Sequence, residues 1–392
     1  MSEQVAAAFD VEALVAAACA ETGLDDFGDP RFREGLVVLC ETLATTAGLS
    51  EKGVRINRGR LARLLATRLR VEAAFARHPE IHDRKLLRPM FLTGLPRTGT
   101  SATFNLLGRD PATRPLLLWE GTFPDPHEGL APGADDPRHL AMREHFRRVR
   151  EKNPDFTRIH FADADTPEEC VIPMALSFEN VHNGIEVLME PYASWFRKRD
   201  LRPQYAYYRE LLKLLDWQRP GERWLLKSPA HLWAMDALVD VFPDCCIVLT
   251  HRDPLDAIGS YCSMMETLLA SQGCSPQPGL GPTVLDFCAT SLERGYAVRD
   301  AGDPRRFIDV RFADFVAEPM AAVRAIYAHF ELPLGAEAEA AMARYARENP
   351  RGKHGAHEYD LERYGLSEAA VRDRLGWYID RFELGGGPRE AD

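Results

Sequence analysis

The 392-residue sequence lacks the features that mark several common classes of protein. Its eight cysteines form no C-x-x-C pair and no spacing typical of a zinc site, and most lie in apolar stretches, as buried thiols do in a reducing compartment. No apolar stretch approaches the length that crosses a membrane. The residues Glu3 and Asp10 do not suit the basic start of a secretory signal. We therefore expect a cytoplasmic protein with no metal site and no membrane span.

Positive charge is also scarce. The chain has 48 Lys and Arg against 59 Asp and Glu, so its formal net charge is −11. Such a chain repels phosphate backbones, and we do not expect a nucleic-acid partner. An anionic ligand must instead be held by a local cluster of donors that acts against the overall field.

The most informative segment is 91–101, which reads Phe-Leu-Thr-Gly-Leu-Pro-Arg-Thr-Gly-Thr-Ser. A short apolar strand enters a turn with Gly94 and Gly99 and then a helix, whose first N–H groups favour an anion. The spacing follows the Walker pattern G-x-x-x-x-G-K-[ST], except that Thr100 replaces the lysine and Arg97 is the only cation. The segment predicts a phosphate-binding loop that does not hydrolyse ATP. Its expected donors are Arg97, Thr98, Gly99, Thr100 and Ser101.

A second segment adds a second anion site. The apolar stretch 245–250 predicts a buried strand; it is followed by Arg252 and, eight residues later, by Ser260 in a predicted helix. These two side chains can converge on a phosphate. Together the two segments resemble the sulfotransferases that use 3′-phosphoadenosine 5′-phosphosulfate (PAPS), of the bacterial type, with a PRxGT loop similar to that of the tyrosylprotein sulfotransferases. The resemblance covers about 89–330. It implies that the loop holds the 5′-phosphosulfate and that Arg252 and Ser260 hold the 3′-phosphate, without a metal.

Four residues are candidates for catalysis. The resemblance implies that Lys227, at the end of a predicted strand, stabilises the leaving group, while Arg97 acts electrostatically. Two residues compete for the role of general base. Glu120 stands about where the tyrosylprotein type has a catalytic glutamate, and the adjacent tryptophan favours a raised pKa. His231 follows Lys227 by four residues, whereas the cytosolic enzymes have a spacing of two, so Glu120 is favoured over His231.

Two further elements of the resemblance concern the nucleotide. Arg351 and Lys353, in the segment 349–355, resemble the RKGxxG segment that closes over the 3′-phosphate, although the spacing differs and no GDW follows. Phe312 stands where the family often has a tyrosine, so we expect it to stack on the adenine.

The order of the predicted elements indicates the fold. Predicted strands at 90–93, 223–226, 245–250 and 306–312 alternate with helical patterns, which is typical of a P-loop-like three-layer α/β/α fold with a mostly parallel central sheet. We expect a helical extension at 1–88 and a sulfotransferase core at 89–392. Within that core we expect a substrate-cap insertion at 120–220 and a closing segment at 331–392. Six arginines of the extension are interpreted as a solvated helix face in preference to an anion-facing one: Arg55, Arg58, Arg60, Arg63, Arg68 and Arg70.

The sequence thus predicts an enzyme that moves a sulfuryl group from PAPS to a hydroxyl of a small acceptor. An apolar or aromatic acceptor is suggested by the aromatic-rich insertion, but these rings suit a protein core equally well. A homodimer is a possible assembly. Two alternatives stay open: a P-loop phosphotransferase, which Thr100 disfavours, and a non-catalytic nucleotide-binding protein, which Lys227 and Glu120 disfavour.

Overall fold

A five-stranded parallel sheet lies at the centre of the computed structural model, which describes residues 3–127, 129–130, 134–152, 163–179, 188–349 and 360–385. The strand order is β2-β3-β1-β4-β5, and every neighbouring pair is parallel. The strands are β1 (Met90–Gly94), β2 (Thr113–Pro115), β3 (Arg223–Lys227), β4 (Cys246–His251) and β5 (Phe307–Arg311).

The central strands are buried on both faces, as parallel sheets covered by helices require. All five residues of β1 and all six of β4 are buried. Because side chains alternate along a strand, Phe91 enters one hydrophobic core while Met90 and Leu92 enter the other. The sequence predicts four of the five strands to within one or two residues, but it misses β2, which is short and contains Arg114 and Pro115.

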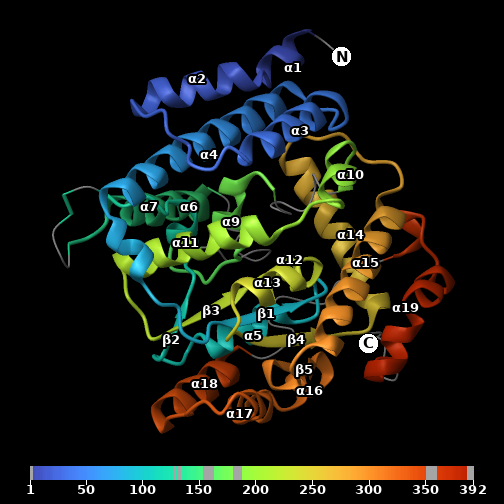
Figure 1. Ribbon diagram of the computed structural model, residues 1–392. Helices are drawn as coiled ribbons and strands as arrows, with labels where there is room; N and C mark the ends of the chain where they lie inside the picture. The colour runs from blue at the N-terminus through green and yellow to red at the C-terminus, as the bar shows by residue number, and fades with distance from the viewer. Residues whose placement is uncertain are drawn as a thin grey trace.

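Helices cover both faces of the sheet, so the predicted three-layer α/β/α fold is confirmed (Figure 1). One face carries the helices α11 (Arg202–Gln218), α12 (Ala230–Trp233), α13 (Met235–Val241) and α15 (Leu280–Ala301). The opposite face carries α5 (Thr100–Leu107), α17 (Pro319–His329) and α18 (Ala336–Glu348). The remaining elements after β3 are α14 (Pro254–Ser271), η4 (Pro304–Arg306), α16 (Phe312–Ala317), η5 (Glu362–Tyr364) and α19 (Glu368–Phe382).

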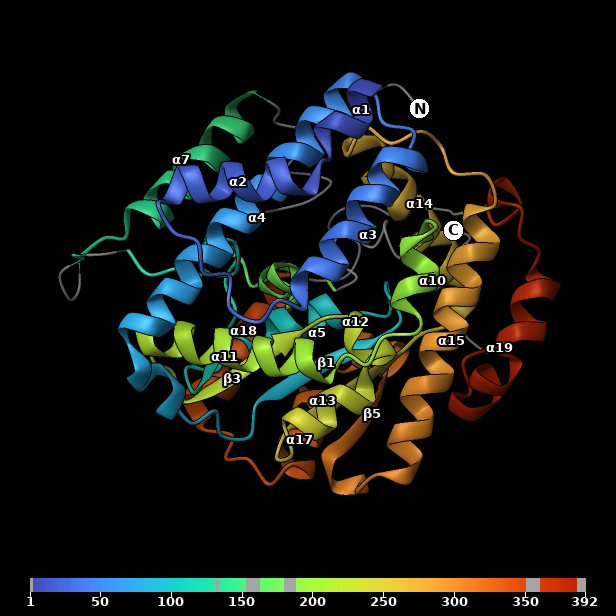
Figure 2. The same cartoon turned by 45° about the horizontal axis from the view of Figure 1, so that its top comes forward.

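The residues before β1 form an outer helical layer, which lies over the α11 side of the molecule in both views (Figures 1 and 2). Its elements are α1 (Glu3–Ala8), α2 (Val11–Thr22), α3 (Phe32–Thr45), α4 (Glu51–Arg77) and η1 (Pro79–Asp83). Leu61, Leu65 and Leu69 of α4 belong to the same buried cluster as Phe91 of β1. The layer therefore shares a continuous core with the sheet.

The segment between β2 and β3 is helical in its described part. It contains α6 (Leu118–Thr122), α7 (Pro137–Lys152), α9 (Val171–Met174), η2 (Ala175–Ser177), α10 (Tyr192–Phe196) and α11. Its aromatic rings serve mainly as core: Phe178, Tyr192, Phe196, Tyr205 and Tyr208 are each at most 2% exposed. These rings therefore give no support to an apolar acceptor pocket. Among the described residues, no helix is long and apolar enough to span a membrane.

Candidate active site

The loop between β1 and α5 folds as the sequence predicts, because both of its glycines occupy positions where a side chain does not fit. Gly94 has φ of 150°, and a Cβ there would lie 2.5 Å from the carbonyl oxygen of Thr250. Gly99 has φ of 90°, and a Cβ there would lie 2.5 Å from the ring of Phe312. Arg97 between them adopts φ of 70°, a left-handed conformation that non-glycine residues rarely take.

Hydroxyl groups fix the base of this loop. The Thr98 hydroxyl lies 2.6 Å from the carbonyl oxygen of Leu95, to which it donates, and 2.7 Å from the hydroxyl of Thr250 in β4. Thr98 and Thr100 are both buried, and Thr100 is the first residue of α5. The backbone N–H groups at the start of α5 are thereby held in a fixed position, which suits an anion.

One cluster of side chains lies on the β4 side of the loop. The Arg97 Nε donates to the Ser260 hydroxyl at 2.9 Å, so the loop reaches α14 directly. Arg252 lies close to the Arg97 carbonyl oxygen and forms an ion pair with Asp256 at 3.3 Å. Its guanidinium also lies 5.0 Å from the centre of the Phe312 ring. The structure therefore brings together Arg97, Arg252, Ser260 and Phe312, four of the residues assigned to the donor.

A second cluster lies on the β3 side and contains a residue that the sequence reasoning missed. The Lys227 Nζ donates to the Ser101 hydroxyl at 3.2 Å and forms an ion pair with Glu169 at 2.7 Å. The second carboxylate oxygen of Glu169 lies 3.4 Å from the Ser228 hydroxyl. The Lys227 side chain is 5% exposed and that of Glu169 is 29% exposed, so the carboxylate is the more accessible partner.

The backbone explains how Glu169 reaches Lys227. The Cys170 N–H donates to the Lys227 carbonyl oxygen at 3.0 Å, which places the residue before Cys170 at the end of β3. Glu169 belongs to no predicted strand and to no motif quoted from the sequence, and 58 residues separate it from Lys227. Only the adjacent pair Glu168-Glu169 before an apolar stretch was available as a signal in the sequence.

His231 lies apart from both clusters, within the core. It is fully buried, its Nδ1 lies 2.7 Å from the Tyr205 hydroxyl, and its ring packs edge-on against Phe91. Burial lowers the pKa of His231 to about 3. A base must contact the acceptor, and a ring enclosed in this way does not.

Glu120 is likewise enclosed, in an ion-pair cluster with two arginines. Its side chain is 3% exposed, and one oxygen accepts from Arg114 at 3.0 Å and from Arg219 at 2.7 Å. The other oxygen accepts from Arg219 at 3.0 Å and from the Leu117 N–H at 3.3 Å. Burial lowers the pKa of Arg114 to about 10, although the charge of Glu120 opposes this effect. Each oxygen of Glu120 is thus occupied by two donors.

None of the hydrogen bonds and ion pairs of Glu120 among the described residues involves the anion loop, Lys227 or Glu169. Two other predicted donor residues, Arg351 and Lys353, lie outside the described residues. Among the described residues, no group of three His, Cys, Asp or Glu side chains is arranged to hold a metal ion.

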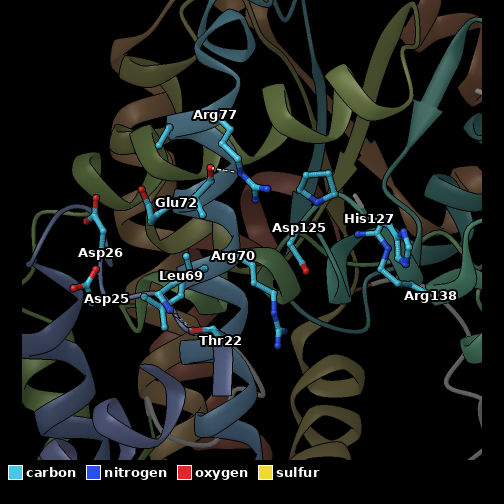
Figure 3. A pocket seen from close by; sticks show the side chains of 14 residues that line it. Thr22, Asp25, Asp26, Leu69, Arg70, Glu72, Arg77, Asp125, His127 and Arg138 are labelled. Carbon is cyan, nitrogen blue, oxygen red and sulfur yellow. Dashed lines mark hydrogen bonds between the residues drawn. The ribbon is translucent and has the colours of Figure 1, made fainter. Parts of the chain in front are cut away.

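Two cavities lie away from the anion loop. The first, of about 680 Å³, separates α4 from the segment 125–127; Figure 3 shows Arg70 and Arg77 of α4 on one side of it and Asp125, His127 and Arg138 on the other. Burial raises the pKa of Asp125, and the nearby Arg138 opposes the shift. The second, of about 810 Å³, shares Arg77 and Arg138 with the first and extends to Glu120. Among the described residues, neither cavity is lined by the loop, Lys227 or Glu169.

The parallel sheet, the glycine loop at a helix start and the two cationic clusters beside it define a transferase of the P-loop-like class that handles an anionic group. Comparison with known proteins narrows the class. Residues 89–336 match the model of the sulfotransferase family, and the chain belongs to that family.

Its relatives include proteins of known structure and one of known activity. The chain is similar to the sulfotransferase STF1 from Mycobacterium tuberculosis, with 34% identity, a TM-score of 0.82, and coverage of 94% of this chain and 98% of the other. It is similar to STF9 from Mycobacterium avium, with 29% identity, a TM-score of 0.87, and coverage of 95% and 96%. The omega-hydroxy-beta-dihydromenaquinone-9 sulfotransferase Stf3 of Mycobacterium bovis is 26% identical over 318 residues, which are 75% of this chain and 74% of the relative. The predicted family and enzyme class are thereby confirmed.

Proposed function

We propose that this sulfotransferase uses PAPS as donor and that its acceptor is the hydroxyl of a small, largely apolar molecule. The observation that carries the proposal is the pair of Lys227 and Glu169 beside Ser101, because it places a cation and a carboxylate at the edge of the anion loop. The apolar acceptor is inferred from the name of the relative Stf3, which acts on a hydroxylated menaquinone derivative.

The residues of the loop suit the phosphosulfate end of the donor. The N–H groups that begin α5, with the hydroxyl of Ser101, would bind its oxygens, because the first N–H groups of a helix have no partner within the helix. Arg252 and Ser260 would bind the 3′-phosphate, and Arg97, which already contacts Ser260, would link the two ends. The predicted contributions of Arg351 and Lys353 stay part of this proposal.

Phe312 suits the nucleoside. Its ring lies against the backbone of Gly99 on one side and near the guanidinium of Arg252, so it forms a flat apolar surface next to the proposed 3′-phosphate site. Purine rings stack on such surfaces.

In the reaction, the acceptor oxygen forms a bond to sulfur while the bond between sulfur and the bridging phosphate oxygen breaks. The proton of the acceptor hydroxyl must leave, and negative charge develops on the departing phosphate. We assign Glu169 as the general base, because it is the partly exposed carboxylate of the pair. Lys227 would neutralise the charge on the leaving oxygen, and Arg97 would assist electrostatically.

We further propose that Glu120 is a positioning residue. It fixes the segment 116–120, and that segment binds the backbone next to Glu169: Leu118 donates to Thr166 at 3.0 Å, and Glu168 donates to Leu116 at 2.8 Å. The ion pairs of Glu120 would thus fix the backbone segment that positions Glu169. This assignment replaces both bases that the sequence offered, Glu120 and His231.

The first test is a calorimetric titration of the protein with 3′,5′-ADP and with ATP, each with and without magnesium. The proposal expects micromolar binding of 3′,5′-ADP without metal and much weaker binding of ATP. Ser260→Ala should weaken 3′,5′-ADP about ten-fold, because it removes a hydroxyl from the proposed 3′-phosphate site, whereas Ser263→Ala, one turn along the same helix, should leave it unchanged. Preference for ATP with magnesium would overturn the proposal.

A further inference from the structure

The helix α4 carries a row of cations that the proposed reaction does not use. Four of its arginines are engaged: Arg68 is buried and donates to backbone carbonyls, Arg70 pairs with Glu21, Arg60 donates to Asn57, and Arg77 donates to the carbonyl oxygen of Ala73. The others are exposed, and within the described part of the chain none of them forms an ion pair. These residues, which we call the α4 stripe, are Lys52, Arg55, Arg58 and Arg63.

The stripe occupies one side of the helix. At 3.6 residues per turn its four residues fall within an arc of about 140°. The opposite side is buried and holds α4 in place: Leu61 and Leu65 enter the core, and the Asn57 amide donates to the carbonyl oxygen of Gln272 at 3.0 Å. Gly59 lies within the stripe, and a Cβ there would meet only the Arg63 guanidinium, at 3.5 Å, among the described residues. The stripe is thus uncovered at its centre.

Nearby carboxylates do not neutralise the stripe. The acidic residues of α2, which lies beside α4 (Figure 2), are engaged elsewhere: Glu12 with Arg33 and Glu21 with Arg70. Glu51, at the first turn of α4, is exposed, lies four residues before Arg55 on the same side of the helix, and offsets one of the four positive charges. Like charges three residues apart on a helix, such as Arg55 and Arg58, destabilise it. A local positive field therefore persists on a chain whose net charge is −11.

We propose that the α4 stripe docks the protein on a membrane surface rich in anionic phospholipids. Arginine binds phosphate oxygens with two parallel hydrogen bonds, and a helix fixed in a rigid layer presents four cations to one plane. The inference rests on the proposed function in one respect: an apolar acceptor partitions into a membrane, so docking brings the enzyme to its substrate. We therefore expect the α4 stripe to bind a lipid surface and not an acidic protein.

The test is flotation with vesicles of phosphatidylcholine alone or with one third phosphatidylglycerol. The wild-type protein should float with the anionic vesicles in 0.1 M NaCl and lose binding in 0.5 M NaCl, because salt screens exposed charges. Each cation near an anionic surface contributes about five-fold in affinity. Replacing all four with glutamine (Lys52→Gln, Arg55→Gln, Arg58→Gln, Arg63→Gln) should therefore weaken binding several hundred-fold.

A matched control removes four exposed cations elsewhere: Lys85→Gln, Arg344→Gln, Arg347→Gln and Arg372→Gln. Both variants lower the net charge by four. A difference in vesicle binding between them therefore reflects the position of the removed cations and not the total charge. Equal losses in the two variants, or wild-type binding that does not depend on phosphatidylglycerol, would overturn the proposal; so would binding to acidic proteins without binding to vesicles. Titration with 3′,5′-ADP should be unchanged in both variants, and a protein that floats but binds no nucleotide would instead refute the proposed function.

Discussion

Replacing Glu120 with glutamine separates positioning from catalysis. The substitution keeps the shape of the side chain but removes the charge that faces Arg114, which is 3% exposed, and Arg219. Removing one partner of a buried ion pair typically costs 3–5 kcal/mol, and we expect about 3 kcal/mol here because Arg219 is 46% exposed and regains water. Chemical denaturation should show this loss in the free energy of unfolding. Turnover of the variant should be lower, because the backbone around Glu169 loosens. The decrease of kcat/KM toward acidic pH should nevertheless remain as in the wild type, because Glu169 is still present.

Glu169→Gln is the matched variant and should show the opposite pattern. The partly exposed Glu169 contributes less to stability, but a general base contributes about 10²- to 10⁴-fold to the rate. We expect a loss of turnover in that range, unchanged affinity for 3′,5′-ADP, and a pH–rate profile without its acidic limb. Glu120→Asp should recover part of the stability and turnover lost in Glu120→Gln, because it restores the charge. The reasoning is refuted if Glu120→Gln is as stable as the wild type, binds 3′,5′-ADP normally and loses both turnover and the acidic limb.

Two further predictions concern buried groups. Because burial lowers the His231 pKa to about 3, below its ordinary value of about 6.5, the unfolded chain binds this proton more readily and stability falls as pH drops below 6.5. At pH 5.5 the loss relative to pH 8 is about 1.4 kcal/mol; His231→Gln should remove it from the pH dependence of unfolding, and an unchanged dependence would contradict the assignment. Gly99→Ala should weaken 3′,5′-ADP at least ten-fold by displacing Phe312, as measured by calorimetry, whereas Gly279→Ala, at φ of 75° in open space, should not.

The sequence predicts which residues of the proposed donor site lie together, because each part of that site is local in the sequence. The anion loop follows one strand, and Arg252 and Ser260 follow another, so two short segments and the parallel order of the sheet suffice to bring them together. The same locality makes the fold predictable, since β1, β3 and β4 are short, mostly buried apolar stretches.

The acceptor side is not predictable in this way. Glu169 lies beside Lys227 because the Cys170 N–H donates to the carbonyl oxygen at the end of β3 and the Glu168 N–H donates to Leu116, and both bonds join segments that are distant in the sequence. The adjacent tryptophan led us to expect a raised pKa for Glu120. In the structure, however, Arg114 and Arg219 enclose its carboxylate, and no sequence motif links either arginine to Glu120. The spacing of His231 from Lys227 likewise does not reveal that the short buried helix α12 turns its side chain toward Tyr205.

The cluster on the β4 side of the loop and the cluster on the β3 side therefore differ in how easily substitutions elsewhere can move their side chains. Arg97, Arg252 and Ser260 depend on β1, β4 and α14, whose contacts are regular and buried, whereas Glu169 depends on a segment held by Glu120 and by a few backbone bonds. A change in the insertion can alter where the acceptor meets the base without moving any donor ligand. If the proposed assignments hold, one donor site can serve different acceptors, because the donor residues are fixed by local sequence while the position of Glu169 depends on the tertiary structure around it.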